Sequence, residues 1–180
     1  MSKWIFALIQ FFPLSTFATF ATFAFWNGVP SNERWLDAFQ LGALLGLIQL
    51  AILLPQNTPL NRLVLAGNIY LILGGLAVFF QQWWYLKLYD SLRESAIILL
   101  MAFIGTITTF ASSSGFIAVK GSTRELSIYL LVATFLMLPF AIYFEGNRTY
   151  AAVFPIIFLA IFQRYLSYIA KERLVVQSTS

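Results

Sequence analysis

The sequence predicts an all-α integral membrane protein, a polytopic bundle of about six transmembrane helices. Of its 180 residues, 60% are hydrophobic and 10% are charged, whereas soluble domains have about 45–50% and about 25%. A chain this short cannot bury so much apolar surface in its own core, so lipid must solvate much of it. The apolar residues also gather into long stretches separated by short polar connections, and a membrane span needs about 20 such residues.

No connection between these stretches is long enough to separate domains, so we expect one domain over residues 1–180. The first stretch is too long for the apolar region of a signal peptide, about 7–15 residues, and it lacks an A-x-A-like cleavage site. We therefore expect it to be a retained anchor. The predicted spans are Trp4–Trp26, Leu36–Leu54, Leu63–Phe80, Leu92–Ala111, Leu126–Phe144 and Thr149–Ile169.

Capping signals set the expected boundaries of these spans. Ser31 can cap the second helix, and Thr58-Pro59 is typical of an N-cap followed by proline at the first helical position. Ser91–Glu94 and Ser122–Glu125 each have the form of a capping box, which predicts a helix start at that point. The polar tail after the last span is expected to fray.

The connection Gln81–Glu94 is expected to lie at the level of the lipid headgroups. It contains Trp83, Trp84, Tyr85 and Tyr89. Clustered amphipathic aromatic side chains are typical of this depth.

Two groups of small residues predict close helix packing. Gly42 and Gly46 form a GxxxG motif, which lets two membrane helices touch along their backbones. By default we interpret this motif as packing within the chain, and dimerisation is the more specific alternative. At 100° per residue, half of the fourth helix is lined by small and hydroxyl side chains: Gly105, Thr106, Thr108, Thr109, Ser112, Ser113 and Gly115.

We expect this small-residue face to pack against another helix, with the threonine stripe of the first span (Thr16, Thr19 and Thr22) as a plausible partner. About 20 residues from the predicted start of the fourth helix reach only to Ala111. Ser112–Gly115 is therefore expected at or beyond the interface, as a break in the helix. Asn68 lies within the third span, where an amide side chain is typically bonded to a neighbouring helix and less often lines a ligand site.

The distribution of basic residues predicts that both termini are cytoplasmic. Six spans place the termini on one side, and that side carries seven Lys/Arg residues against four on the other, as the positive-inside rule requires. The seven are Lys3, Arg62, Lys120, Arg124, Arg164, Lys171 and Arg173, and the four are Arg34, Lys87, Arg93 and Arg148. Because the basic residues are scattered among loops, the net charge of +4 indicates orientation rather than nucleic-acid binding.

The residue types present argue against an enzyme. The chain has no Cys and no His, which excludes thiol nucleophiles, imidazole bases and thiolate or imidazole metal ligands. No carboxylate falls in the middle of a predicted span. A Ser-Lys mechanism using Lys120 with Ser112–Ser114 is conceivable, but Lys120 is more simply an orientation charge. We expect no catalytic residue, cofactor or metal site.

Two short stretches carry a family resemblance: Phe11–Leu14 ahead of an aromatic helix, and Gly74–Leu76 with Phe79, Phe80 and then Lys87. In these stretches the chain resembles the intracellular septation protein A family. The resemblance implies a small polytopic protein of the bacterial inner membrane, linked to cell division and envelope integrity, with no established catalytic site.

Two functions remain open on the sequence. The first is a non-catalytic structural or accessory protein, whose partners are the lipid bilayer and other membrane proteins or further copies of itself. The alternative is a small-solute-binding or transport subunit, because six helices in about this length is also the build of vitamin-binding subunits of energy-coupling-factor transporters. In that alternative Asn68, Thr106 and Thr109 would line the site, with Trp83 and Trp84 at its mouth.

Overall fold

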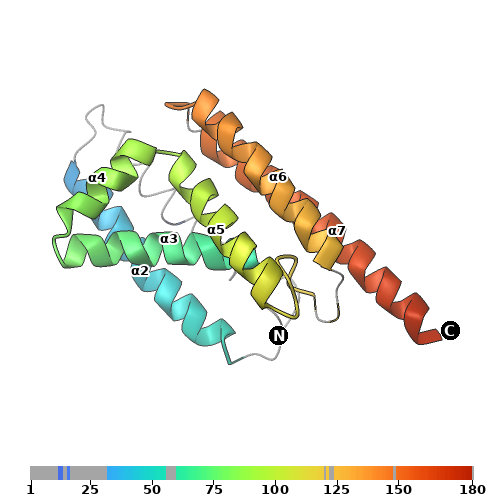
Figure 1. The fold of residues 1–180 in the computed structure, drawn as a ribbon. Helices are drawn as coiled ribbons and strands as arrows, with labels where there is room; N and C mark the ends of the chain where they lie inside the picture. The colour runs from blue at the N-terminus through green and yellow to red at the C-terminus, as the bar shows by residue number, and fades with distance from the viewer. Residues whose placement is uncertain are drawn as a thin grey trace. The chain divides into compact units, whose positions relative to one another are not determined.

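The computed structural model of the chain describes residues 12–13, 16, 32–55, 60–119, 121, 124–147 and 149–179 (Figure 1). The predicted all-α class is confirmed, because these residues contain helices and no strand. The elements are α2 (Asn32–Leu53), α3 (Arg62–Phe79), α4 (Trp83–Leu92), α5 (Ser95–Ala111), α6 (Arg124–Tyr143), the π-helical turn η1 (Thr149–Val153) and α7 (Phe154–Thr179). The predicted first span, Trp4–Trp26, lies outside the described residues except for positions 12, 13 and 16.

Among the described residues, four helical segments are long and apolar enough to cross a membrane: Leu36–Leu53, Arg62–Phe79, Arg124–Tyr143 and Thr149–Val176. α4 and α5 would add a fifth span if the two helices, which are bent at the break between them, are counted together. The described part of the chain therefore has the helices of an integral membrane protein, as the composition predicts.

The predicted helix start at Thr58-Pro59 is wrong by a few residues, although those two residues themselves lie outside the described part. α3 begins at Arg62, and its cap is Asn61, whose Oδ1 accepts hydrogen bonds from the backbone N–H of Leu63 (2.9 Å) and of Val64 (3.3 Å). An Asn side chain satisfies free N–H groups at a helix start as a Thr does. The caps proposed at Ser31 and Ser122 fall outside the described residues.

The capping box at Ser91–Glu94 is not formed. Ser91 is inside α4, where its hydroxyl donates back to the Leu88 carbonyl. α5 begins at Ser95, after an N-cap residue, Glu94, that makes no side-chain capping bond. Most of the predicted connection is thus a helix, bounded by two non-glycine residues with left-handed backbones, Gln81 (φ 54°) and Arg93 (φ 44°), a conformation typical of tight turns.

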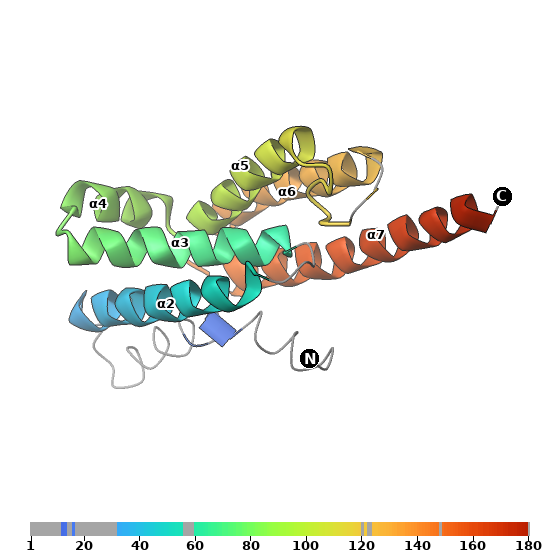
Figure 2. The same cartoon turned by 90° about the horizontal axis from the view of Figure 1, so that it is seen from below.

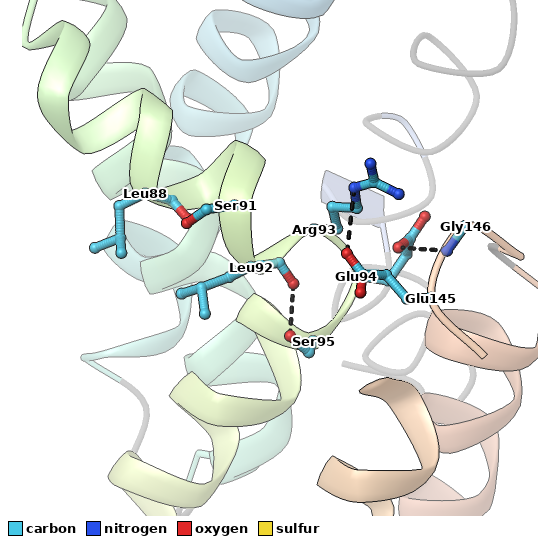
Figure 3. Close-up of polar contacts among 8 residues, drawn as sticks. All are labelled: Leu88, Ser91, Leu92, Arg93, Glu94, Ser95, Glu145 and Gly146. Atoms are coloured by element: carbon cyan, nitrogen blue, oxygen red, sulfur yellow. Dashed lines mark hydrogen bonds and ion pairs between the residues drawn. The ribbon is translucent and has the colours of Figure 1, made fainter. Parts of the chain in front are cut away.

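Polar contacts tie the start of α5 to the turn after α6 (Figure 3). Arg93 Nε lies 3.3 Å from Glu145 Oε1, and the Gly146 N–H donates to Glu94 Oε2 at 3.4 Å. The Glu94 side chain thus bonds to the turn after α6 instead of capping α5. Because the ion pair is about half exposed, its contribution to stability is small.

The predicted fraying of the C-terminal tail is also wrong, since α7 continues to Thr179. Arg173 Nη1 lies 3.3 Å from Glu125 Oε2 at the start of α6. A Cβ on Gly121 would lie 3.3 Å from Leu174, so the last turns of α7 pack beside the loop that precedes α6. These contacts stabilise the last turns of α7 as a helix, although the composition of this segment is polar.

The chain divides into two compact units. The first unit comprises Met1–Asn57 and Gly67–Ser91, and the second comprises Thr58–Ala66 and Leu92–Ser180. In the first unit α2 runs beside α3 (Figure 2), at a contact made by Gly46 against Asn68 and Gly75 against Ala43. Glycine permits this approach because it has no side chain to hold the backbones apart.

In the second unit α5 packs against α6, and α6 against α7 (Figure 1). Phenylalanine rings fill the junction of α6 and α7: the Phe140 ring centroid lies 5.4 Å from that of Phe154 and 4.7 Å from that of Phe144. These distances are typical of favourable aromatic pairs. The contacts of Arg93 and Glu94 lie at one end of this unit, and those of Glu125 and Arg173 lie at the other.

Candidate functional site

The interior of the first unit contains a buried amide pair. Asn68 Nδ2 donates to Gln49 Oε1 across the contact of α3 with α2. Gln49 is 3% exposed and Asn68 is 1% exposed. Gly46 lies directly beside Asn68, and Gly42 is buried one turn earlier in α2. The predicted residues Gly46 and Asn68 thus meet at a helix contact, and the partner that sequence reasoning missed is Gln49.

We expect Asn68→Leu to lower the free energy of unfolding by about 1–2 kcal/mol, because it removes a buried hydrogen bond between helices. Replacing both partners (Asn68→Leu with Gln49→Leu) should recover part of that loss, since two apolar side chains leave no polar group in the contact. Unfolding in mixed SDS and mild detergent, followed by Trp fluorescence, measures both. Gln40→Leu, on an exposed position of α2, is the control. Strictly additive effects of the two substitutions would contradict the pairing.

An aromatic cluster joins α3 to α4 in the first unit. The Tyr89 hydroxyl donates to the Tyr70 carbonyl, and the Tyr85 hydroxyl donates to that of Tyr89, both at 3.2 Å. The Tyr70 and Tyr89 rings are 4.7 Å apart. Trp83 and Trp84, predicted at headgroup depth, are largely exposed on α4.

Gly105, on the small-residue face of α5, packs against the loop that follows this helix in the second unit. A Cβ added to Gly105 would lie 2.6 Å from Cε1 of Phe116. Phe116 is fully buried, and its backbone N–H donates to the hydroxyl of Ser127, also fully buried, at 3.1 Å. Gly105 therefore accommodates an aromatic ring from the loop, in a helix that also packs against α6.

Two of the three threonine hydroxyls of this face are bonded within α5. Thr106 donates to the Ala102 carbonyl at 2.8 Å, and Thr108 donates to that of Ile104 at 2.7 Å. Thr109 differs, because its hydroxyl is buried and has no hydrogen-bond partner among the described residues. Most threonine hydroxyls here therefore satisfy their own helix, as Ser and Thr side chains commonly do in membrane helices.

The predicted break after Ala111 is present. Ser112, the C-cap of α5, has an extended backbone (φ −109°, ψ 134°), and the chain then turns through Gly115 (φ 60°) and Ala118 (φ 59°). A left-handed backbone is unfavourable for alanine and marks a constrained loop. Ser113 is exposed at the tip, whereas Gly115 is buried.

The feature of most chemical interest is a cluster of Arg62 with two serines of this loop, all within the second unit. Arg62 Nη2 lies 3.3 Å from Ser112 Oγ and 3.2 Å from Ser114 Oγ, and the two serine oxygens are 3.1 Å apart. Ser114 is buried and Arg62 is partly buried. The two ion pairs among the described residues join other arginines, Arg93 and Arg173, to carboxylates. Arg62 therefore carries its charge among hydroxyl groups.

The sequence predicts Ser112 and Ser113 as site residues, and it offers Ser114 only beside Lys120 in the Ser-Lys alternative. It predicts Arg62 as an orientation charge, because nothing local distinguishes such an arginine from a ligand-binding one. The contact of Arg62 with Ser112 and Ser114 is what the sequence does not reveal. The residues proposed as a solute site do not share a unit: Asn68 belongs to the first unit, and Thr106 and Thr109 belong to the second.

The described residues contain no group of three or more His, Cys, Asp or Glu side chains that could hold a metal ion. Comparisons with protein-family models, curated proteins and solved structures find no match for this chain.

Proposed function

We propose that this chain is a non-catalytic, multi-pass protein of the bacterial inner membrane with a structural or accessory role and both termini in the cytoplasm. Its partners would be the lipid bilayer and other membrane proteins, including further copies of itself. The resemblance to the septation protein A family supports a place in envelope or cell-division assemblies.

The observation that carries this proposal is the free surface of α7. In the apolar 18-residue part of Thr149–Val176, 22% of the residues are buried, against 56% of those in Arg62–Phe79. Ile161, Tyr165 and Tyr168 are each exposed by more than half. Tyr165 and Tyr168 lie near the predicted end of the span, where a tyrosine ring packs well and its hydroxyl can bond to a headgroup or to a protein partner. Such a face is suited to contact with another protein.

The glycine contacts also favour α7 as the surface that binds a partner. Gly46, Gly74, Gly75 and Gly105 all face side chains or backbone of this chain. Because the close-packing sites are used internally, a partner is more readily placed on α7 than on the GxxxG motif of α2.

Native mass spectrometry of the protein in mild detergent or nanodiscs tests the proposal. We expect an oligomer, or a second protein in fixed ratio, that is lost in the double variant Tyr165→Ala, Tyr168→Ala. Phe103→Ala, on the exposed face of α5 (62% exposed), is the matched control and should leave the assembly intact. A monomer that carries a stoichiometric small molecule would contradict the structural role and support the solute-binding alternative.

A further inference from the structure

The hydrogen-bond donors of Arg62 are only partly used. A guanidinium group has five N–H donors and no acceptor. Two donors on Nη2 are directed to Ser112 and Ser114. The Nε–H is buried and meets no acceptor in the described part of the chain. An unbonded buried donor is unfavourable. The Arg62 guanidinium therefore still has a donor that an oxygen acceptor would satisfy.

The two serine hydroxyls also leave a hydrogen-bond donor available. Both oxygens accept from Arg62, and they lie within hydrogen-bond distance of each other. Ser112 Oγ also accepts from the Ser114 N–H at 3.4 Å. If one hydroxyl donates to the other, one hydroxyl hydrogen remains for a further acceptor. The cluster as a whole therefore offers donors and a positive charge.

The position of Arg62 in α3 also favours an anion at this site. Arg62 is the first residue of the helix, where the helix dipole disfavours a cation and favours an anion. A second cation lies beside the same loop: the Arg124 guanidinium is 5.8 Å from the centre of the Phe110 ring, and its Nη2 donates to the Phe110 carbonyl at 3.5 Å. Glu125, the nearby acid on α6, is held by Arg173 and by the Tyr129 hydroxyl.

We propose that Arg62, Ser112 and Ser114 form a binding site for a phosphate group. A phosphate monoanion or diester presents several oxygens in a geometry that suits an arginine fork and hydroxyl donors. The site lies at the end of the candidate span Arg62–Phe79, where membrane proteins meet lipid phosphates, and basic pockets at this depth bind anionic headgroups. This assignment goes beyond the structural role and does not depend on it.

The phosphate can come from a lipid headgroup or from free phosphate in solution, and a titration separates these sources. Delipidated protein in mild detergent is titrated with phosphatidylglycerol, with inorganic phosphate, and with diacylglycerol, which has the tails but no phosphate. Bound species are counted by native mass spectrometry. We expect one bound phosphatidylglycerol and no specific diacylglycerol. Binding of inorganic phosphate with the same dependence on Arg62 would uphold the site and assign it to a soluble ligand.

Arg62→Gln should weaken phosphate binding by about tenfold or more, as expected when a charge-assisted hydrogen bond is lost. The matched control is Arg173→Gln. It removes the same charge from the same end of the second unit but from an arginine that already has a carboxylate partner, and it should change affinity less than about twofold.

Two further variants keep the test decisive if Arg62→Gln does not fold. Ser112→Ala with Ser114→Ala retains the arginine and should weaken binding about threefold to tenfold. Arg62→Lys retains the charge but loses the planar fork, so it should bind more weakly than the wild type. Equal affinity in the wild type and in either of these variants would overturn the site, as would binding of diacylglycerol as tight as that of phosphatidylglycerol.

Discussion

Gly75→Ala is expected to lower the free energy of unfolding by about 1–3 kcal/mol, the usual cost of overpacking a helix contact. A Cβ at this position would overlap the Ala43 Cβ and would lie 2.9 Å from the Phe39 carbonyl oxygen. Neither atom can turn away, because one is attached directly to the backbone and the other is part of it. The two helices must separate, and the neighbouring amide pair of Gln49 and Asn68 would weaken with them.

Gly46→Ala is the matched control on the facing helix. Its Cβ would lie 3.5 Å or more from Ile72 and Asn68, at ordinary contact distance. Alanine also favours a helix over glycine by about 1 kcal/mol, so this variant should be neutral or slightly more stable. Unfolding in SDS and mild detergent measures both variants. A loss for Gly46→Ala as large as that for Gly75→Ala would show that the α2–α3 contact is wrongly placed.

Gly105→Ala is expected to have a comparable effect in the second unit, about 1–3 kcal/mol. The added methyl would lie 2.6–2.9 Å from three atoms of the Phe116 ring. The ring has no free space to enter, because Phe116 is fully buried and its backbone is bonded to Ser127. The loop that carries Ser112 and Ser114 should therefore shift.

A smaller side chain at position 116 tests the cause of that effect. Phe116→Leu alone should destabilise the protein, because it removes buried ring carbons. Combined with Gly105→Ala, it should cost less than the sum of the two single changes, since the leucine makes room for the methyl. Thermal unfolding of the four proteins gives the coupling energy. Additive losses would mean that Phe116 does not pack on Gly105.

The helical class and most helix positions could be predicted from the sequence because hydropathy over about 20 residues is a local property. α3 and α6 are observed within two residues of the predicted ends. α4 could not be predicted, because its aromatic residues have the composition of an interfacial connection, and neither Gln81 nor Arg93 is a typical left-handed residue. The end of α7 was underestimated because the contacts that stabilise it come from distant residues.

The polar sites could be predicted less completely than the helices, because they are formed by contacts between residues far apart in the sequence. An amide within a span signals a hydrogen bond but does not name its partner, and Gln49 is 19 residues from Asn68. Arg62 is 50 residues from Ser112, and no local pattern joins them. The break at Ser112 was expected from membrane thickness, but the turn that brings Ser114 towards Arg62 depends on the fold of the loop.

The helices of the second unit are expected to cross a membrane, with the loop that carries Ser112 and Ser114 and the end of α7 on one side. Ser167 Oγ donates to the Ile117 carbonyl at 3.3 Å, which places α7 beside this loop. The chain has no cysteine, so single cysteines report accessibility directly. Ser113→Cys, Lys171→Cys and Asn147→Cys are all at exposed positions.

The measurement is labelling of these three variants with a membrane-impermeant maleimide in intact cells and in inverted vesicles. We expect Asn147→Cys to react in intact cells, and Ser113→Cys and Lys171→Cys to react only in inverted vesicles. Reaction of all three from the same side would contradict this arrangement of the second unit across a membrane.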